Sequence, residues 1–277
     1  EVCQTEYEIW AKQFGWEKRH PKAGADQGPV KRGGGMANAL WYYFYGTGFQ
    51  VEVQVHGDGS VELTNGVQDI GTGIRTVMAM VAAEELGLEP SAIAVKIGDT
   101  NFGLGPASGG SQTTGGITPA VRHAAYAAKL KMFEIAAPLL KVPADALSAG
   151  GGKIFVTRDP TKNLTWKQVA SKIAGDKFTV IGERVKDYLS VAPPFIRGVQ
   201  FAEVEVDTET GVIAVKRVLA VHDCGRPMNR LTTENQINGG IIQGISYALF
   251  EDRLLDRNTG LMVNANFDQY KISGSMD

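Results

Sequence analysis

The chain has 277 residues, a formal net charge of −2 and 43% hydrophobic residues. This balance is typical of a globular protein and offers no basic excess for nucleic-acid binding. No run of 18 apolar residues occurs, so the sequence predicts no membrane span. The length suits one large domain or two medium ones.

Glycine is unusually frequent, at 34 residues. The glycines cluster at 33–35, 57–59, 71–73, 103–116, 150–152 and 239–244. Such clusters indicate turns and sites lined by backbone rather than a low-complexity tract.

Cysteine and histidine usage predicts neither disulfides nor a metal bound by side chains. The two cysteines, Cys3 and Cys224, lie far apart in the chain. We therefore expect a reducing compartment, the cytoplasm, with the periplasm as the alternative if a signal segment precedes the chain. The four histidines lack the spacing of metal ligands: His20, His56, His123 and His222.

The N-terminal region begins with an amphipathic pattern. Aromatic and small residues of 3–18 share one helical face, so we expect a helix there. Residues 18–35 are rich in glycine and lysine and are predicted to be a connector. Residues 41–45 are aromatic enough for a strand.

A β-hairpin is predicted at 49–64, where valines alternate with polar residues around the turn 57–59. A glycine-rich loop, 66–73, follows the hairpin. It opens into an apolar helical pattern that Gly87 ends as a C-cap.

The next elements repeat this order of strand, glycine loop and helix. A short strand is expected at 93–97, and the loop 103–116 follows it. A helix then runs from Ser111, with Ser111 or Thr113 as N-cap, until Pro138 stops it.

A second hairpin, 202–218, leads through a turn-rich segment into a helix at 233–255. We accordingly divide the chain into a first subdomain, 1–195, and a second, 196–277. Glycines in the last helix suggest close approach by a backbone or a ligand, and Gln243 lies among them. The alternative for Gln243 is an ordinary exposed helix residue.

The polar side chains are most closely spaced in the second glycine loop. Within seven positions it holds four hydroxyls and one amide: Ser108, Gly109, Gly110, Ser111, Gln112, Thr113 and Thr114. Free N–H groups and the helix dipole at such a helix start attract an anion, typically phosphate. The alternative is a flexible loop with an ordinary cap. A nucleotide-binding enzyme is disfavoured, because no Walker lysine follows Gly110 or Gly116.

Four blocks in this order resemble the molybdenum-binding large subunit of the xanthine dehydrogenase / aldehyde oxidase family. They are residues 66–76, 98–116, 223–229 and 234–244. The resemblance covers essentially the whole chain. It implies an α+β fold with two β-hairpin/Gly-loop/helix units, and a molybdenum–molybdopterin cofactor, in the cytosine dinucleotide form of bacterial members.

The resemblance also implies roles for individual positions. Ile70, Gly71 and Thr72 correspond to the loop near the molybdenum and its dithiolene. Residues 108–114 correspond to the cradle for the pterin and its phosphates, and Gln243 to a glutamine that hydrogen-bonds the pterin. Many members have Gln where this chain has Thr72, so a contact to the metal's oxygen ligand would here be water-mediated or absent.

The activity implied by the family is hydroxylation of an aldehyde or N-heterocycle, with water as the oxygen source. The family's catalytic Glu lies in a Gly-Glu-Pro type motif that this sequence lacks, so no catalytic residue is assigned; Glu234 and Glu251 are read as solvated carboxylates. We expect an internal piece, or one subunit of a split enzyme, that is inactive alone.

The implied partners are the remaining molybdenum-subunit segments and the subunits or domains that carry [2Fe–2S] clusters and FAD. Two cysteines cannot ligate such clusters. The alternative function is a non-catalytic nucleotide- or pterin-binding module, or an assembly module.

Overall fold

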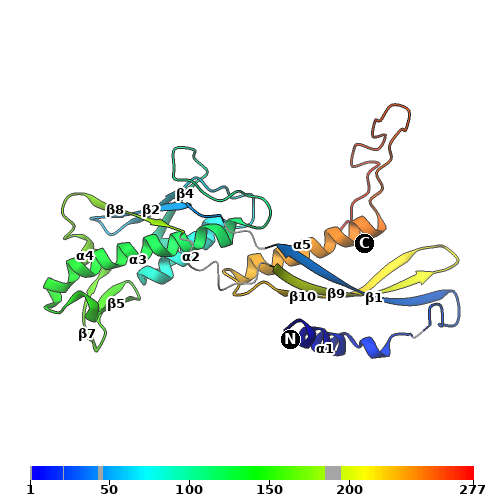
Figure 1. Ribbon diagram of the computed structural model, residues 1–277, viewed down its shortest axis with the longest axis horizontal. Coiled ribbons are helices and arrows are strands. Elements are labelled where there is room, and N and C mark those ends of the chain that lie inside the picture. Colours follow the sequence, from blue (N-terminus) through cyan, green and yellow to red (C-terminus); the bar gives the residue numbers. More distant parts are fainter. Residues whose placement is uncertain (1, 21, 43–45, 185–194) are drawn as a thin grey trace. The chain divides into compact units, whose positions relative to one another are not determined.

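The computed structural model describes residues 2–20, 22–42, 46–184 and 195–277 (Figure 1). The chain forms two compact units. Unit 1 comprises Glu1–Tyr42 and Phe195–Asp277, and unit 2 comprises Tyr43–Pro194. The expected first subdomain, 1–195, is therefore wrong for its first 42 residues, which belong with the C-terminal part of the chain.

Unit 2 is built on a four-stranded sheet with the strand order β4-β3-β2-β8. Its strands are β2 (Gln50–His56), β3 (Val61–Asn65), β4 (Ile93–Ile97) and β8 (Lys177–Glu183). β2 pairs antiparallel with β3 and β8, which confirms the hairpin expected at 49–64. β3 pairs parallel with β4, because a helix connects these two strands.

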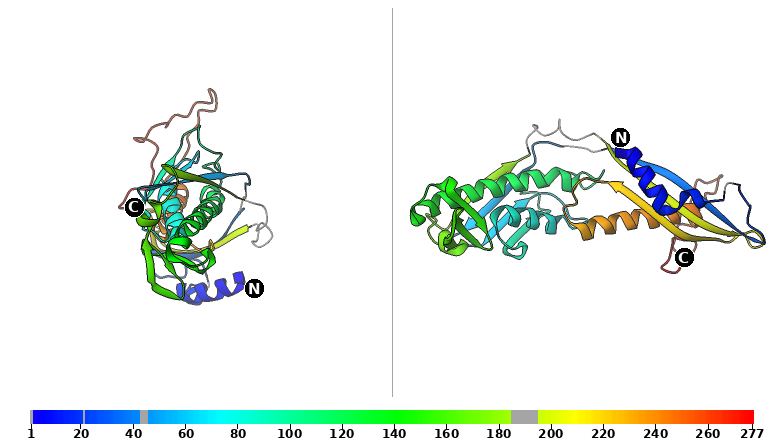
Figure 2. Two further views of the ribbon diagram at one scale, coloured as in Figure 1. Left: turned by 90° about the vertical axis from the view of Figure 1, so that its left-hand side faces the viewer. Right: turned by 90° about the horizontal axis from the view of Figure 1, so that it is seen from below.

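Helices α2 (Ile74–Leu86) and α3 (Thr113–Leu140) pack side by side against one face of this sheet (Figure 2). Alternate valines of β2 are buried beneath them. The approach of α3 to β8 is close: a Cβ atom on Gly182 would lie 2.1 Å from the backbone nitrogen of Ala124. The C-cap expected at Gly87 is confirmed by its left-handed conformation.

Two expectations for α3 are wrong. The helix continues through Pro138 to Leu140, because packing against the sheet outweighs the single hydrogen bond that a proline removes. Its N-cap residue is Gln112 rather than Ser111 or Thr113, since Ser111 adopts a left-handed conformation with φ 59°.

A small antiparallel sheet completes unit 2. It consists of β5 (Leu147–Gly150), β6 (Lys153–Val156) and β7 (Asp159–Thr165). The short helix α4 (Trp166–Ala170) follows, and Thr165 and Gln168 form a capping box at its start. Single 3-10 turns lie at Pro90–Ala92 and Ala144–Ala146.

Unit 1 contains a three-stranded antiparallel sheet with the order β1-β9-β10. Its long strands are β1 (Val30–Tyr42), β9 (Phe195–Asp207) and β10 (Ile213–Asp223). The hairpin expected at 202–218 is confirmed as part of the longer β9–β10 pair. The connector expected at 18–35 is wrong at its end, because β1 begins at Val30 and pairs with β9 despite its glycines.

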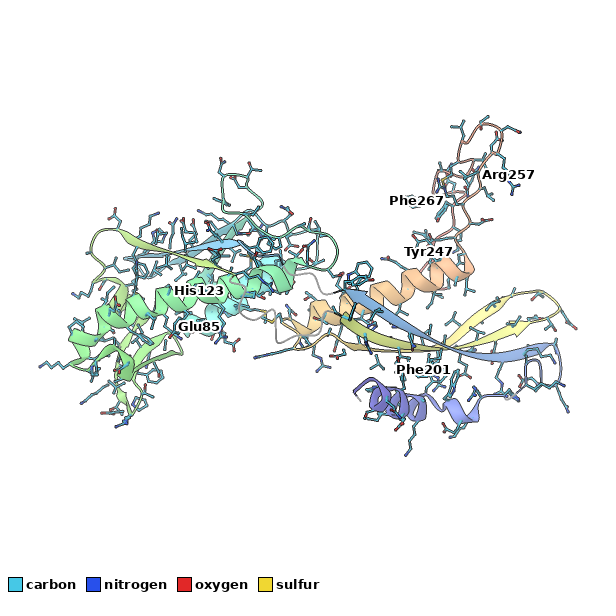
Figure 3. The ribbon with its side chains drawn as sticks, viewed as in Figure 1. Glu85, His123, Phe201, Tyr247, Arg257 and Phe267 are labelled. Atoms are coloured by element: carbon cyan, nitrogen blue, oxygen red, sulfur yellow. The ribbon has the colours of Figure 1, made fainter. Side chains whose placement is uncertain are left out.

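The core of unit 1 lies between this sheet and the N-terminal helix α1 (Val2–Phe14) with its 3-10 turn, Trp16–Lys18. Phe14 stacks on Phe201 of β9 with ring centroids 5.3 Å apart, and Trp16 meets Phe201 edge-on at 5.7 Å. Figure 3 shows Phe201 between β9 and α1.

Helix α5 (Arg230–Leu249) begins at the N-cap Asn229 and ends before the expected residue 255. Among its residues Ser246 is the buried one. The segment 250–277 is irregular and is tied back to the helix: the Tyr270 hydroxyl lies 2.8 Å from the Glu251 carboxylate, and the Ser273 N–H donates to Ser246 Oγ.

The α+β fold with two β-hairpin/Gly-loop/helix units is thus confirmed, with β2–β3 leading into α2 and β9–β10 leading into α5. Within the described ranges no helix has the length and apolarity needed to cross a membrane. The same residues contain no group of three or more His, Cys, Asp or Glu side chains placed to hold a metal ion.

Replacing the ring at the centre of the unit 1 core should destabilise the unit. We expect Phe201→Ala to lower the free energy of unfolding by about 3–5 kcal/mol, because it removes the fully buried ring that α1 packs against. Urea unfolding followed by tryptophan fluorescence measures this. Phe267→Ala is the control: its ring is 84% exposed, so a change within about 0.5 kcal/mol is expected. Equal losses of unfolding free energy in the two variants would contradict the placement of Phe201 at the centre of this core.

Candidate anion site at the ends of two parallel strands

The parallel pairing of β3 and β4 brings two glycine loops to one edge of the sheet. The register places Asn65, the last residue of β3, beside Ile97, the last residue of β4. The loop 66–73 leaves the first strand and enters α2, and the segment 98–112 leaves the second and enters α3. Ligands of open sheets with helical connections bind at this carboxyl edge of the strands.

Asn65 joins the two loops. Its side chain is fully buried, and Nδ2 donates to the carbonyl oxygens of Gln50 (2.7 Å), Gly103 (3.1 Å) and Leu104 (3.2 Å). Its Oδ1 accepts the Val67 N–H at 2.8 Å. One amide therefore holds the start of the first loop, the start of the second loop and the edge of β2 together.

The base of the second loop lies directly on this backbone. A Cβ atom on Gly105 would lie 2.4 Å from Asn65 Oδ1 and 2.7 Å from the Val67 nitrogen. One on Gly103 would lie 2.9 Å from the Gln50 carbonyl oxygen. These contacts are too short for any side chain, so the glycines are required by close approach rather than by flexibility.

The first loop contains an anionic side chain, Asp69, that accepts backbone N–H groups. The Asp69 carboxylate accepts the N–H groups of Gly71 (3.0 Å), Gly73 (3.2 Å) and Arg75 (3.2 Å). Partial burial raises the pKa of this carboxyl, but the three N–H groups outweigh burial and leave the pKa below its ordinary value. The start of α2 is therefore already neutralised by Asp69. Ile70, 65% exposed, lies on the outside of this loop.

The start of α3 is arranged differently. The Gln112 side chain donates to the Gly109 carbonyl oxygen at 2.9 Å, and the Thr113 hydroxyl donates to that of Ala107 at 2.9 Å. These bonds shape the loop, whereas in the part of the chain that the structure describes no N-cap side chain closes the helix. The first N–H groups of α3 and its positive dipole end remain to bind an anion.

The predicted cradle is accessible. Gly109, Gly110 and Ser111 are exposed, and the side chains of Ser108 and Thr114 are half-buried. A Cβ atom on Gly109 would meet no protein atom within 4 Å. Ser111 holds a left-handed backbone that L-residues rarely adopt, and such local strain is typical of ligand-binding loops.

A buried cation, the Arg184 guanidinium, contacts the first turn of α3. Pro119 has no N–H group, so the helical hydrogen bond to the Gly115 carbonyl oxygen cannot form. The Arg184 guanidinium donates to that oxygen instead, and the Arg184 side chain is 1% exposed. Its positive charge adds to the helix dipole and favours an anion at the cradle.

Gln243 lies in unit 1, on an exposed stretch of α5. The neighbouring glycines, Gly239, Gly240 and Gly244, have no protein atom within 4 Å of a Cβ position among the described residues. Within unit 1 no described backbone approaches these glycines, so the expected approach by a backbone or a ligand stays a prediction. A role of Gln243 toward a ligand stays a prediction.

Three residues that shape the two loops were missed by sequence reasoning: Asn65, Asp69 as an internal cap, and Arg184. Asp69 carried a readable signal, because an Asp two residues before a glycine often caps a turn. The amide donor contacts of Asn65 and the contact of Arg184 carried none, since these partners lie far away in sequence, at 15–39 and 69 residues.

This geometry places a helix start without a side-chain cap at the carboxyl edge of the sheet. The chain matches the family described as molybdopterin cofactor-binding domain over residues 10–277. It therefore belongs to the molybdopterin cofactor-binding domains of the xanthine dehydrogenase / aldehyde oxidase family of molybdenum hydroxylases.

Individual relatives agree with this membership. The chain is 30% identical over 276 residues to the xanthine dehydrogenase molybdenum-binding subunit of Escherichia coli O157:H7, covering 94% of this chain and 36% of the relative. It is 29% identical over 274 residues to an aldehyde oxidoreductase molybdenum-binding subunit of Escherichia coli K12, covering 95% and 35%. The chain thus spans about a third of the length of these relatives.

Solved structures share the fold. Quinoline 2-oxidoreductase from Pseudomonas putida 86 superposes with a TM-score of 0.78 at 21% identity, covering 100% of this chain and 36% of that one. At this identity the likeness concerns the fold alone.

Removing the amide that joins the two loops should loosen both. We expect Asn65→Ala to cost on the order of 3 kcal/mol, because it leaves buried backbone groups without their partner. Hydrogen exchange of residues 66–73 and 103–112 should speed up together. Asn101→Ala is the control: its exposed side chain donates to Asp99 within the same segment, so exchange of residues 66–73 should stay unchanged. Exchange that rises in one loop alone would contradict a shared hub.

The Asp69 cap should depend on pH. A carboxyl whose pKa is lowered in the folded protein stabilises fully above its unfolded pKa, near 3.8, and loses this effect as the pH falls through the folded value. We expect Asp69→Asn to reduce the exchange protection of the Gly71, Gly73 and Arg75 amides at pH 6. The difference from wild type should vanish at acid pH. NMR protection factors, corrected for intrinsic rates, measure this, and a difference that is constant with pH would refute it.

Proposed function

We propose that this chain holds the phosphorylated end of a molybdenum–molybdopterin cofactor in a molybdenum hydroxylase. The observation that carries the proposal is the contrast between two helix starts at one sheet edge. The start of α2 is closed by Asp69, whereas the start of α3 offers N–H groups without a side-chain cap. A phosphate fits the second start and is excluded electrostatically from the first.

The cradle residues would act by binding and orienting. Backbone N–H groups and hydroxyls of 108–114 would donate to phosphate and pterin oxygens, with the Arg184 charge behind them. Ile70, Gly71 and Thr72 lie on the loop that Asp69 holds in place and would face the metal end of the cofactor. Gln243 would donate an amide hydrogen bond to the pterin.

When bound, the cofactor supplies two-electron hydroxylation chemistry, and the proposed substrate is an aldehyde or an N-heterocycle with water as the oxygen source. The residues of this chain position the cofactor, and none of them is assigned as the proton-accepting base. The shorter Thr72, in place of a glutamine, would leave room for a water between its hydroxyl and the metal's oxygen ligand.

We further propose that other protein covers α5 and the segment 250–277 in the working enzyme. Large apolar side chains are exposed on α5 and on the segment that follows it: Leu231 at 75%, Ile242 at 55%, Tyr247 at 71% and Phe267 at 84%. Figure 3 labels Tyr247 and Phe267. An apolar surface of this extent is typical of an interface. The expected partners are the remaining molybdenum-subunit segments, with [2Fe–2S] clusters and FAD on further subunits or domains.

Filling the cradle should abolish cofactor retention. Gly109→Leu adds a side chain at a position whose Cβ atom would meet no protein atom within 4 Å, so we expect it to fill the cradle without disturbing the loop. We expect the protein, isolated from its native host with the proteins bound to it, to contain molybdenum by mass spectrometry and to release cytidine monophosphate on acid treatment. The variant should lose at least tenfold of both.

Gly35→Leu is the matched control, because it is equally open but lies on β1. Equal molybdenum content in the two variants, or no molybdenum in the wild type, would refute the proposed function. Release of no cytidine nucleotide would reject the dinucleotide form alone.

A further inference from the structure

A polar cavity lies in unit 1, between the end of α1 and the sheet. It has a volume of about 380 Å³, which is the size of a small-molecule site. Its walls come from the end of α1, the turn that follows, and strands β1, β9 and β10. They are Lys12, Gln13, Phe14, Gly15, Lys18, Arg19, His20, Arg32, Gly33, Gly34, Glu203 and Arg217.

The charge of this cavity is strongly one-sided. Five permanent cations line it, and Glu203 is the single carboxylate among the lining residues. This occurs in a chain whose formal net charge is −2. Because low-dielectric walls focus the field of clustered charges, such a cavity concentrates anions.

Part of this charge is fixed by internal pairs. Arg217 donates to the Glu203 carboxylate at 2.9 Å and to the Phe14 carbonyl oxygen at 2.7 Å. Arg32 donates twice to Asp26, with contacts of 2.9 and 3.2 Å. These arginines are held in place and keep further N–H donors for a ligand.

The other three cations, Lys12, Lys18 and Arg19, form no ion pair with any residue that the structure describes. Arg19 lies over the Trp16 ring, 4.3 Å from its centroid, and donates once to the Trp16 carbonyl oxygen. The ammonium groups of Lys12 and Lys18 make no ion pair or hydrogen bond with any residue that the structure describes. The cavity thus has more positive charge than its own acidic residues neutralise.

The floor of the cavity is backbone. Gly33 and Gly34 stand in the middle of β1, where strands favour bulky side chains. A Cβ atom on Gly34 would come no closer than 3.9 Å to its neighbours, Ala202 O and Arg19 Cβ. No steric clash therefore requires glycine at this position, and the missing side chain leaves the cavity open.

We propose that this cavity binds a small phosphate that carries several negative charges, such as a diphosphate group. Forked guanidinium donors and lysine ammonium groups are the usual ligands of phosphate oxygens, and the walls, in which Phe14 is the one large apolar residue, do not suit an apolar ligand. None of the lining residues belongs to the cradle at α3, so this inference goes beyond the proposed function.

The test is calorimetric titration of the full chain with inorganic pyrophosphate, with orthophosphate and citrate as comparison ligands. We expect pyrophosphate to bind with one site per chain, at least tenfold more tightly than orthophosphate, and to weaken as salt is raised. No saturable binding, or tighter binding of citrate than of pyrophosphate, would overturn the assignment.

The variant Gly34→Val distinguishes pyrophosphate binding in the cavity from a general attraction of pyrophosphate to surface charge. It keeps every charge but fills the floor, and a β-branched residue suits a strand, so we expect at least a tenfold loss of pyrophosphate affinity. Gly35→Val is the control, because its side chain points to the other face of β1 and its Cβ atom meets no protein atom within 4 Å. Equal affinities of the two variants would overturn the proposal.

A charge variant gives an independent result. Lys18→Gln should weaken pyrophosphate binding about three- to tenfold, because Lys18 lines the cavity and pairs with no described residue. Arg253→Gln removes one exposed positive charge elsewhere in unit 1 and should have little effect. If both variants lose affinity equally, the attraction comes from exposed lysines and arginines in general, and the assigned cavity is wrong.

Discussion

The structure of the candidate site depends on one constraint, the parallel pairing of β3 with β4. Parallel neighbours end at the same edge of a sheet, so the two glycine loops that follow them must emerge together. The Asn65 amide then joins their bases by hydrogen bonds that cross 38 and 39 residues of sequence. Neither loop could be positioned for a common ligand without this pairing.

The two helices at that edge show how similar glycine motifs acquire different roles. Asp69 supplies a carboxylate to the start of α2, while Arg184 supplies a buried cation near the start of α3. Helix dipoles alone would make both starts attractive to phosphate. The Asp69 carboxylate cancels this attraction at α2, and the Arg184 cation strengthens it at α3. A glycine motif in isolation is therefore weak support for a ligand site.

The basic cavity of unit 1 also depends on which charged side chains the fold brings together. Net charge describes the whole chain and conceals the local excess of Lys and Arg beside β1. That excess forms only because α1 and its following turn pack on Phe201 and so bring residues 12–20 against strands from the two ends of the chain.

The sequence by itself determined the elements whose signal is local: alternation at 49–64, the left-handed cap at Gly87, and the polar glycine loop that opens α3. The resemblance of four ordered blocks identified the family. Only the tertiary structure decided that residues 30–42 form a strand with β9, that α3 passes Pro138, and that Asn65 and Arg184 support the loops. These features depend on partners far away in sequence, whose pairing and burial energies exceed local propensities and leave no periodic pattern in the sequence.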